Sequence, residues 1–280
     1  MKKLGLFFFI GFMHVFLFSG KIYSQYDVEF NEVKGSIDKT DEYKKDLGRY
    51  DGYTIPLFDG EAVNFVVYSE KFSPKIFFVN PHGEVLNQNL GTQTNIASIF
   101  TTANEDGDWI LYVVGDSLTQ GDYIFQSAIA SKNSLELPAN ADFCTTFNFV
   151  TAHAKAYFLL MSNVAESQNS VVKLKNSIDS YIDNSDGAYT TKMYEGNSIE
   201  EAEKIYKEYS EKVGECLGKT WKKKSESWVN IEDYKVKSVL YSEPVKENER
   251  IVLVSLQNLT KSKQKFTGNY VVQIMINKKS

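Results

Sequence analysis

The stretch VVGDSLTQGDY, residues 113–123, contains the side chain best placed by sequence to act as a nucleophile, Ser117. A serine hydroxyl attacks poorly unless an adjacent base, most often histidine, accepts its proton. The chain has three histidines, and two of them, His82 and His153, lie beyond the N-terminal apolar run. A serine hydrolase built on Ser117 would therefore depend on one of these two imidazoles.

The run Gly115-Asp116-Ser117-Leu118 resembles the first block of the GDSL family of serine esterases, and the resemblance implies that Ser117 is the nucleophile. In that family a helix follows the serine, and an Asp-x-x-His pair lies near the C-terminus. Here an apolar strand pattern, residues 123–130, follows; no histidine occurs after His153, and Val150 stands where the acid would fall. The residues favour a hairpin loop between two strands, and we predict no catalytic residue. The esterase remains the alternative.

Metal and cofactor sites are also not indicated. The acids of NEDGDW, residues 104–109, could bind calcium through their oxygens, but they lack the spacing of a twelve-residue calcium loop. A turn is the favoured interpretation, and a weak calcium site stays open. Zinc needs three or four convergent ligands, whereas the chain after residue 24 has two Cys and two His. We interpret His82, within the turn sequence NPHG, as an exposed turn residue.

The N-terminus predicts export. Lys2 and Lys3 precede about fifteen mostly apolar residues, and Ser24 supplies a small residue for cleavage. A membrane-spanning helix needs roughly 20 apolar residues, so an uncleaved anchor is the less favoured alternative. We expect a signal peptide over residues 1–24 and a secreted or periplasmic protein without a transmembrane segment.

Cysteine usage agrees with that compartment. The chain has two cysteines, Cys144 and Cys216, and an even pair in an exported protein favours a disulfide. Two buried free thiols are the alternative.

Charge is divided unevenly along the chain. Residues 26–130 hold 17 acids and 7 bases, and residues 131–280 hold 19 acids and 21 bases, so the net charges are -10 and +2. An acidic protein is a poor partner for nucleic acid, whose phosphates attract cationic side chains. The densest basic run is WKKKSESW, residues 221–228. We interpret it as a solvated loop, with a contact site for an anionic surface as the alternative.

The first half of the chain has the apolar period of β-strands. Glycine- and asparagine-containing turns separate short runs rich in β-branched and aromatic residues. This pattern predicts an antiparallel, jelly-roll-like, all-β sandwich over residues 25–131. The runs are residues 53–58, 62–69, 75–80, 109–114 and 123–130.

The period becomes helical after residue 140. One helix is expected between residues 140 and 161, and a second begins at the capping box Ser198/Glu201 and ends at Gly218. Residues 171–175 and 188–194 are strand candidates between the helices, and residues 234–241, 250–256 and 269–277 follow them. The order predicts an α+β domain over residues 132–280, with both helices on one face of an antiparallel sheet. Cys144 and Cys216 would then meet at adjoining helix ends.

The first half also resembles a known family. Residues 35–43, 50–84, 97–114 and 121–126 follow, in order, the pattern of the bacterial pre-peptidase C-terminal domain, within a region of roughly residues 28–130. The resemblance implies a non-catalytic β-sandwich that accompanies secreted hydrolases and aids binding to substrates or surfaces. No peptidase is recognisable beside it, and the second half resembles no family that we identify.

Together these patterns predict a secreted, non-catalytic binding or accessory protein of the bacterial envelope. Its partner would be a protein or a carbohydrate, not nucleic acid, and a homodimer stays open. Besides the GDSL esterase, the catalytic alternative is a hydrolase whose residues, such as paired carboxylates, are dispersed through the fold.

Overall fold

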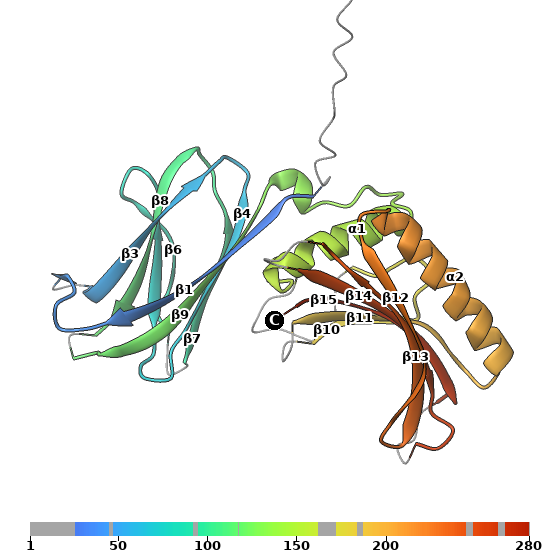
Figure 1. Ribbon diagram of the computed structural model, residues 1–280. Helices are drawn as coiled ribbons and strands as arrows, with labels where there is room; N and C mark the ends of the chain where they lie inside the picture. Colours follow the sequence, from blue (N-terminus) through green and yellow to red (C-terminus); the bar gives the residue numbers. More distant parts are fainter. Residues whose placement is uncertain are drawn as a thin grey trace, which may run out of the picture.

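The computed structural model describes residues 26–44, 47–91, 95–116, 118–161, 172–183, 187–244, 249–262 and 267–279 (Figure 1). The predicted signal peptide, residues 1–24, lies outside these residues. No helix within them is both long and apolar enough to cross a membrane.

Residues 28–130 form two antiparallel sheets that face each other across one apolar core (Figure 1). Apolar side chains alternate along each strand, and the inward set fills the space between the sheets. The central contact is Trp109 stacked on Phe78, with ring centroids 4.7 Å apart. One sheet has the order β1-β9-β4-β7, and its strands are β1 Val28–Ile37, β9 Gly121–Ala130, β4 Ala62–Tyr68 and β7 Ile96–Thr102. The other sheet has the order β2-β3-β8-β5-β6, and its strands are β2 Tyr43–Lys44, β3 Gly48–Leu57, β8 Gly107–Gly115, β5 Lys75–Val79 and β6 Val85–Asn89.

The connection between β8 and β9 differs from the predicted hairpin. β8 belongs to the five-stranded sheet and β9 to the four-stranded sheet, so the loop passes from one layer to the other. Pairing partners lie far apart in sequence: β9 pairs with β1 and β4, and β8 with β3 and β5. Local turn chemistry, on which the hairpin prediction depended, does not reveal such long-range pairing.

The second half is a six-stranded antiparallel sheet with two helices packed on one of its faces (Figure 1). The helices are α1 Phe143–His153 and α2 Ile199–Leu217, and they share one apolar core with the sheet. The sheet order is β10-β11-β15-β14-β13-β12, with β10 Asp179–Asp183, β11 Ala188–Gly196, β15 Tyr270–Lys278, β14 Arg250–Asn258, β13 Tyr234–Ser242 and β12 Lys222–Ile231.

Two of the sequence predictions for this half are wrong. The described part of residues 171–175 is not a strand; the strand that pairs with β11 is β10, which begins at Asp179. The basic run of residues 221–228 is not a loop, because most of it forms β12. Residues 172–175 alternate apolar and basic side chains yet do not form a strand, whereas the three lysines of residues 222–224 do. Local pattern therefore does not decide these segments; pairing with a neighbouring strand does.

The helices begin and end at residues with clear capping roles. The Asp142 carboxylate accepts a hydrogen bond from the Thr145 amide, 2.7 Å away, at the start of α1. Ser198 Oγ accepts one from the Glu201 amide at the start of α2, and Gly218 ends α2 with φ 74°. These contacts confirm the cap and the stop that the sequence predicts for α2.

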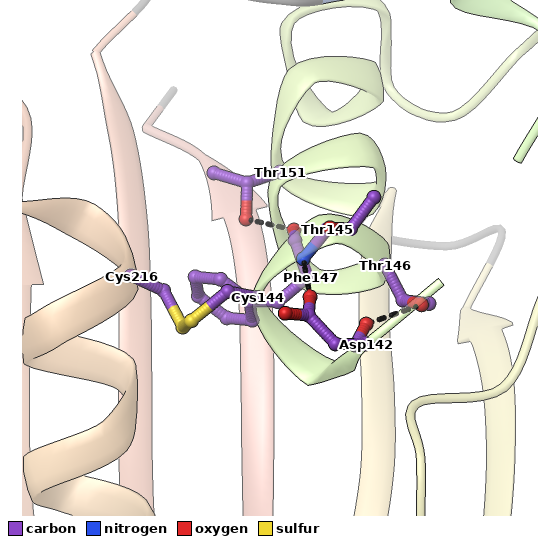
Figure 2. Close-up of a disulfide and its surroundings, with 7 residues drawn as sticks. All are labelled: Asp142, Cys144, Thr145, Thr146, Phe147, Thr151 and Cys216. Carbon is purple, nitrogen blue, oxygen red and sulfur yellow. Dashed lines mark hydrogen bonds between the residues drawn. A yellow bond between two sulfur atoms is a disulfide. The ribbon is translucent and has the colours of Figure 1, made fainter. Parts of the chain in front are cut away.

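A disulfide joins the two helices. Cys144, in the first turn of α1, is bonded to Cys216, near the end of α2, with their Cα atoms 5.1 Å apart (Figure 2). Within α1, the Thr146 and Thr151 hydroxyls donate to the carbonyls of Asp142 and Phe147, four residues earlier, at 2.9 and 2.7 Å (Figure 2). The disulfide therefore joins the start of α1 to the end of α2, as the sequence predicts for antiparallel helices.

The segment after α1 contacts the outer face of the four-stranded sheet. Ala156 and Leu160 join Val28 and Ala128 in a small apolar cluster. The Asn64 side-chain amide, on β4, donates to the Leu159 carbonyl. This segment therefore covers one end of that sheet face and leaves the other end open.

Candidate functional site

The open end of this face carries a groove of about 550 Å³. Three neighbouring strands form its base, because β9 pairs with β1 on one side and with β4 on the other. Side chains directly opposite each other in antiparallel strands point to the same face. The groove is lined by Lys34, Gly35, Ser36, Tyr68, Ser69, Glu70, Lys71, Asp122, Tyr123 and Ile124.

One row of side chains crosses the groove from strand to strand. Lys34 pairs with Ile124, which pairs with Tyr68, and Tyr68 pairs with Ile96 on β7. Ile96 is 41 % exposed, so the apolar part of the row continues past the groove towards the sheet edge. The row presents an aromatic ring and aliphatic groups between polar neighbours.

Groups that form hydrogen bonds surround this row. On the next row, the Gln126 amide donates to the Glu32 carboxylate at 2.8 Å. The Tyr68 hydroxyl donates to Glu70 at 3.2 Å. In the lining, the cations Lys34 and Lys71 balance the anions Glu70 and Asp122, so the groove has no formal net charge.

Ser69 fixes the loop that forms the groove's rim. Its buried hydroxyl donates to the Asp122 carbonyl at 2.8 Å and accepts from the Lys71 and Phe72 amides at 3.1 and 3.3 Å. One side chain thus joins the chain after β4 to the start of β9. The rim is held by β9 as well as by its own strand.

Tyr123 lies below the groove and joins the two sheets. Its hydroxyl donates to the Asp51 carboxylate and lies 2.5 Å from the Tyr53 hydroxyl. Burial, reinforced by the hydrogen bond to Asp51, strongly raises the pKa of Tyr123, and burial raises the pKa of Asp51. A Cβ at Gly35 would lie 2.3 Å from Cζ of Tyr123, so the ring fits because position 35 has no side chain.

The loop that contains the GDSL-like run is described except for Ser117 itself, which lies outside the described residues. Asp116 Oδ1 accepts from the Thr119 hydroxyl at 2.8 Å and from the Leu118 amide at 2.9 Å. The Thr119 hydrogen bond is the largest cause that lowers the pKa of Asp116. β9 begins at Gly121, so no helix follows the loop.

The two histidines beyond the N-terminal run each contact another partner, outside this loop. His82 is exposed in the predicted turn, and its Nε2 lies 2.9 Å from Glu105. His153 is fully buried at the end of α1, and its Nε2 lies 2.9 Å from the Ser134 carbonyl. Burial lowers the pKa of His153 to about 4.

The segment of residues 104–109 forms the predicted turn into β8. Asp106 accepts from the Asp59 amide at 2.7 Å, and Glu105 contacts His82. Among the described residues, no group of three or more His, Cys, Asp or Glu side chains could hold a metal ion.

Sequence reasoning did not find the groove. Its side chains lie on strands that are distant in sequence, with Lys34, Tyr68 and Asp122 each carried by a different strand or its end. The available signal is that Lys34 and Ile124 occupy outward positions, but this alternation identifies a face only after the strand order is known.

No family model matches the chain, and no curated protein matches it. Several solved structures resemble about a third of it. A periplasmic inhibitor of g-type lysozyme, PliG from Aeromonas hydrophila, is 12 % identical, covers 36 % of this chain and 87 % of its own, and has a TM-score of 0.28. The pre-peptidase C-terminal domain of a Bacillus anthracis collagenase is 17 % identical over 35 % of this chain and 87 % of its own, with a TM-score of 0.28. The C-terminal carbohydrate-binding module of the laminarinase LamC from Zobellia galactanivorans is 20 % identical over 36 % of this chain and 100 % of its own, with a TM-score of 0.23.

Proposed function

We propose that the protein is an exported, non-catalytic binding protein, and that the groove on the four-stranded sheet binds a neutral, hydroxyl-rich ligand such as a short glycan. In this proposal residues 1–24 are a signal peptide. Residues 25–131 are the binding domain, of the pre-peptidase C-terminal type. Residues 132–280 are a second, supporting domain.

The observation that carries the proposal is the combination of groups in the groove. Its volume, about 550 Å³, lies within the range of small-ligand sites. Tyr68 offers a ring against which the C–H face of a sugar can pack, and Asp122, Glu70 and Ser36 offer acceptors and donors for hydroxyl groups. Because two lysines balance two carboxylates, the groove has no net charge that would favour a strongly charged ligand over a neutral one.

The disulfide supports the exported location. Protein disulfides persist in oxidising compartments and are rare in the cytosol, and Cys144 is bonded to Cys216.

The test is calorimetric titration of the purified protein with a panel of envelope and plant oligosaccharides. We expect Tyr68→Ala to weaken glycan binding about tenfold, because an aromatic ring packed against a partner contributes about 0.5–1.5 kcal/mol beyond its buried area, and about 1.4 kcal/mol corresponds to a tenfold change in affinity. Tyr43→Ala is the matched control, because Tyr43 is an exposed tyrosine on β2 of the other sheet. Equal affinity in the wild type and Tyr68→Ala would place the site elsewhere.

Two other outcomes would contradict the proposal. One is ester hydrolysis by the purified protein that is lost in Ser117→Ala, which would support the GDSL alternative. The other is stoichiometric capture of one envelope protein, with no glycan bound and with capture unaffected by Tyr68→Ala.

A further inference from the structure

β12 is an unusual edge strand. Within the described part of the chain it pairs with β13 alone, and all ten of its residues are exposed. A long exposed edge presents unpaired backbone N–H and C=O groups and is a template for another strand. Trp228, Val229 and Ile231 add exposed apolar side chains at its C-terminal end.

The consecutive lysines of β12 lie on alternate faces of the sheet. Lys223 is opposite Tyr241, whose hydroxyl donates to the Ser210 carbonyl in α2, so Lys223 lies on the helix side of the sheet. Its Nζ is 5.7 Å from the centre of the Tyr241 ring. Lys224 and Glu226 lie on the opposite face, where Lys224 Nζ is 2.8 Å from Glu226 Oε1.

We propose that β12 pairs with β12 of a second copy of this chain, antiparallel and centred on Ser225. In this register Lys224 of each copy lies directly opposite Glu226 of the other, on the same face. The ion pair that each chain already forms becomes one half of a square of alternating charges. The pairing of β12 with β13 is interrupted by a β-bulge between Glu226 and Val229. Beyond it, the Trp228 ring lies 5.3 Å from Nζ of Lys237, which pairs with Glu203 of α2, so Trp228 is on the helix side and takes no part in this register.

Charge selects this register over its neighbours that keep the same faces together. Centring the pair on Lys224 would set that lysine opposite its own copy, and centring it on Glu226 would do the same for the carboxylate. Like charges directly opposite each other in a sheet are destabilising, and opposite charges are stabilising. The register centred on Lys224 also sets Glu226 opposite Lys222, but it keeps the facing lysines. Of these three registers, only the one centred on Ser225 places no like charges opposite each other.

The test is sedimentation equilibrium of the purified full chain at low salt across a wide concentration range. We expect a dimer, and we expect Lys224→Glu and Glu226→Lys to weaken dimerisation about tenfold or more each, because each change replaces two attractive pairs with two repulsive ones. Mixing the two variants should restore a dimer, since every facing position then carries opposite charges. Restoration by mixing separates loss of pairing from misfolding of a variant.

Lys223→Glu is the matched control, because Lys223 lies on the other face, and it should leave dimerisation nearly unchanged. A chain that stays monomeric at all concentrations overturns the proposal. So does a dimer that tolerates Lys224→Glu, or two variants that fail to associate when mixed. An acidic partner captured by the monomer and lost in Lys224→Glu would assign the edge to a different occupant. Glycan binding in the groove is measured independently, so the two proposals can fail separately.

Discussion

His153 is a buried imidazole with one hydrogen-bonded nitrogen. Its Nε2 donates to the Ser134 carbonyl, because a carbonyl oxygen can only accept. Within the described part of the chain, its Nδ1 has no hydrogen-bond partner. The ring packs against Phe149, with centroids 4.6 Å apart. Ser134 also accepts, through its hydroxyl, from the Asp27 amide at 2.7 Å, so this histidine is part of the contact between α1 and the segment before it. Its role is structural.

This burial makes the stability of the protein depend on pH. The pKa of His153 in the folded protein is about 4, below the ordinary value of 6.5 for histidine, so the unfolded chain binds more protons between these two pH values. Stability from this residue is therefore complete above about pH 6.5 and is lost as the pH falls towards 4, by roughly 3 kcal/mol in total. Urea unfolding at several pH values measures the effect. His153→Gln should flatten the profile in this window.

His82→Ala is the control, because His82 is exposed and should leave the slope in place. Carboxylates titrate in the same range, so the comparison is between the profiles of the variants. An identical slope in His153→Gln would show that His153 does not cause the pH dependence.

At the level of elements, the disulfide connects two helices that pack on the same sheet and share one apolar core with it. Its two cysteines are 72 residues apart in sequence, and the intervening chain includes β10, β11 and most of α2. Closing a loop of this length restricts the unfolded chain and stabilises the fold by about 4 kcal/mol in the chain-entropy model.

We therefore expect reduction to lower the free energy of unfolding by up to about 4 kcal/mol. Urea unfolding with and without reductant measures the change. The double variant Cys144→Ser/Cys216→Ser should match the reduced wild type and show no response to reductant. A reduced protein as stable as the oxidised one would contradict the expected contribution.

The sequence predicts elements best where local chemistry decides them. Asp59-Gly60 and Asn80–Gly83 separate strands as expected, and Ser198 and Gly218 delimit α2. It fails where a strand exists only because a neighbour pairs with it. Lys222–Lys224 carry no apolar alternation, yet they form part of β12 by pairing with β13. The sequence pattern likewise does not predict β6 and β7, because each contains several polar residues and forms a strand by pairing with its neighbour.

At the scale of the whole molecule, Lys278 joins the two halves. This residue, near the end of β15, is 9 % exposed, and its Nζ lies 4.1 Å from the Phe30 ring centre and 4.5 Å from that of Tyr157. Phe30 belongs to β1 and Tyr157 follows α1. Burial lowers the pKa of Lys278, and the nearby Glu32 carboxylate opposes that shift. A single cation thus contacts aromatic rings from both halves.

We expect Lys278→Ala to loosen this junction. Loss of two cation–π contacts and of the lysine stem removes about 1–2 kcal/mol of local stabilisation. Native-state hydrogen exchange should then become about tenfold faster at the amides of β1 near Phe30 and of residues 158–161.

Lys278→Met separates the two contributions, because it keeps an apolar side chain without the charge, and it should give an intermediate rate. Amides of β14 near Val254, in the core of the six-stranded sheet, serve as the internal reference. Unchanged exchange around Phe30 in Lys278→Ala would show that the junction depends on the apolar cluster alone.

The groove is also a property of the whole sheet. The sequence predicts strands and turns around it, and it directs attention to Ser117, in the loop between β8 and β9. The groove instead combines Lys34, Tyr68 and Asp122, which become neighbours because β9 inserts between β1 and β4. Such an insertion depends on pairing between residues far apart in sequence, which are 90 residues apart for Lys34↔Ile124 and 56 for Tyr68↔Ile124.

The fit of Tyr123 over Gly35 has a consequence for related sequences. A side chain on β1 at this point and a large ring on β9 would occupy the same volume. Substitutions at positions 35 and 123 should therefore occur together: a larger residue at position 35 should accompany a smaller one at position 123. A lineage that makes this exchange would also lose the phenol that donates to Asp51, and with it the support beneath the groove.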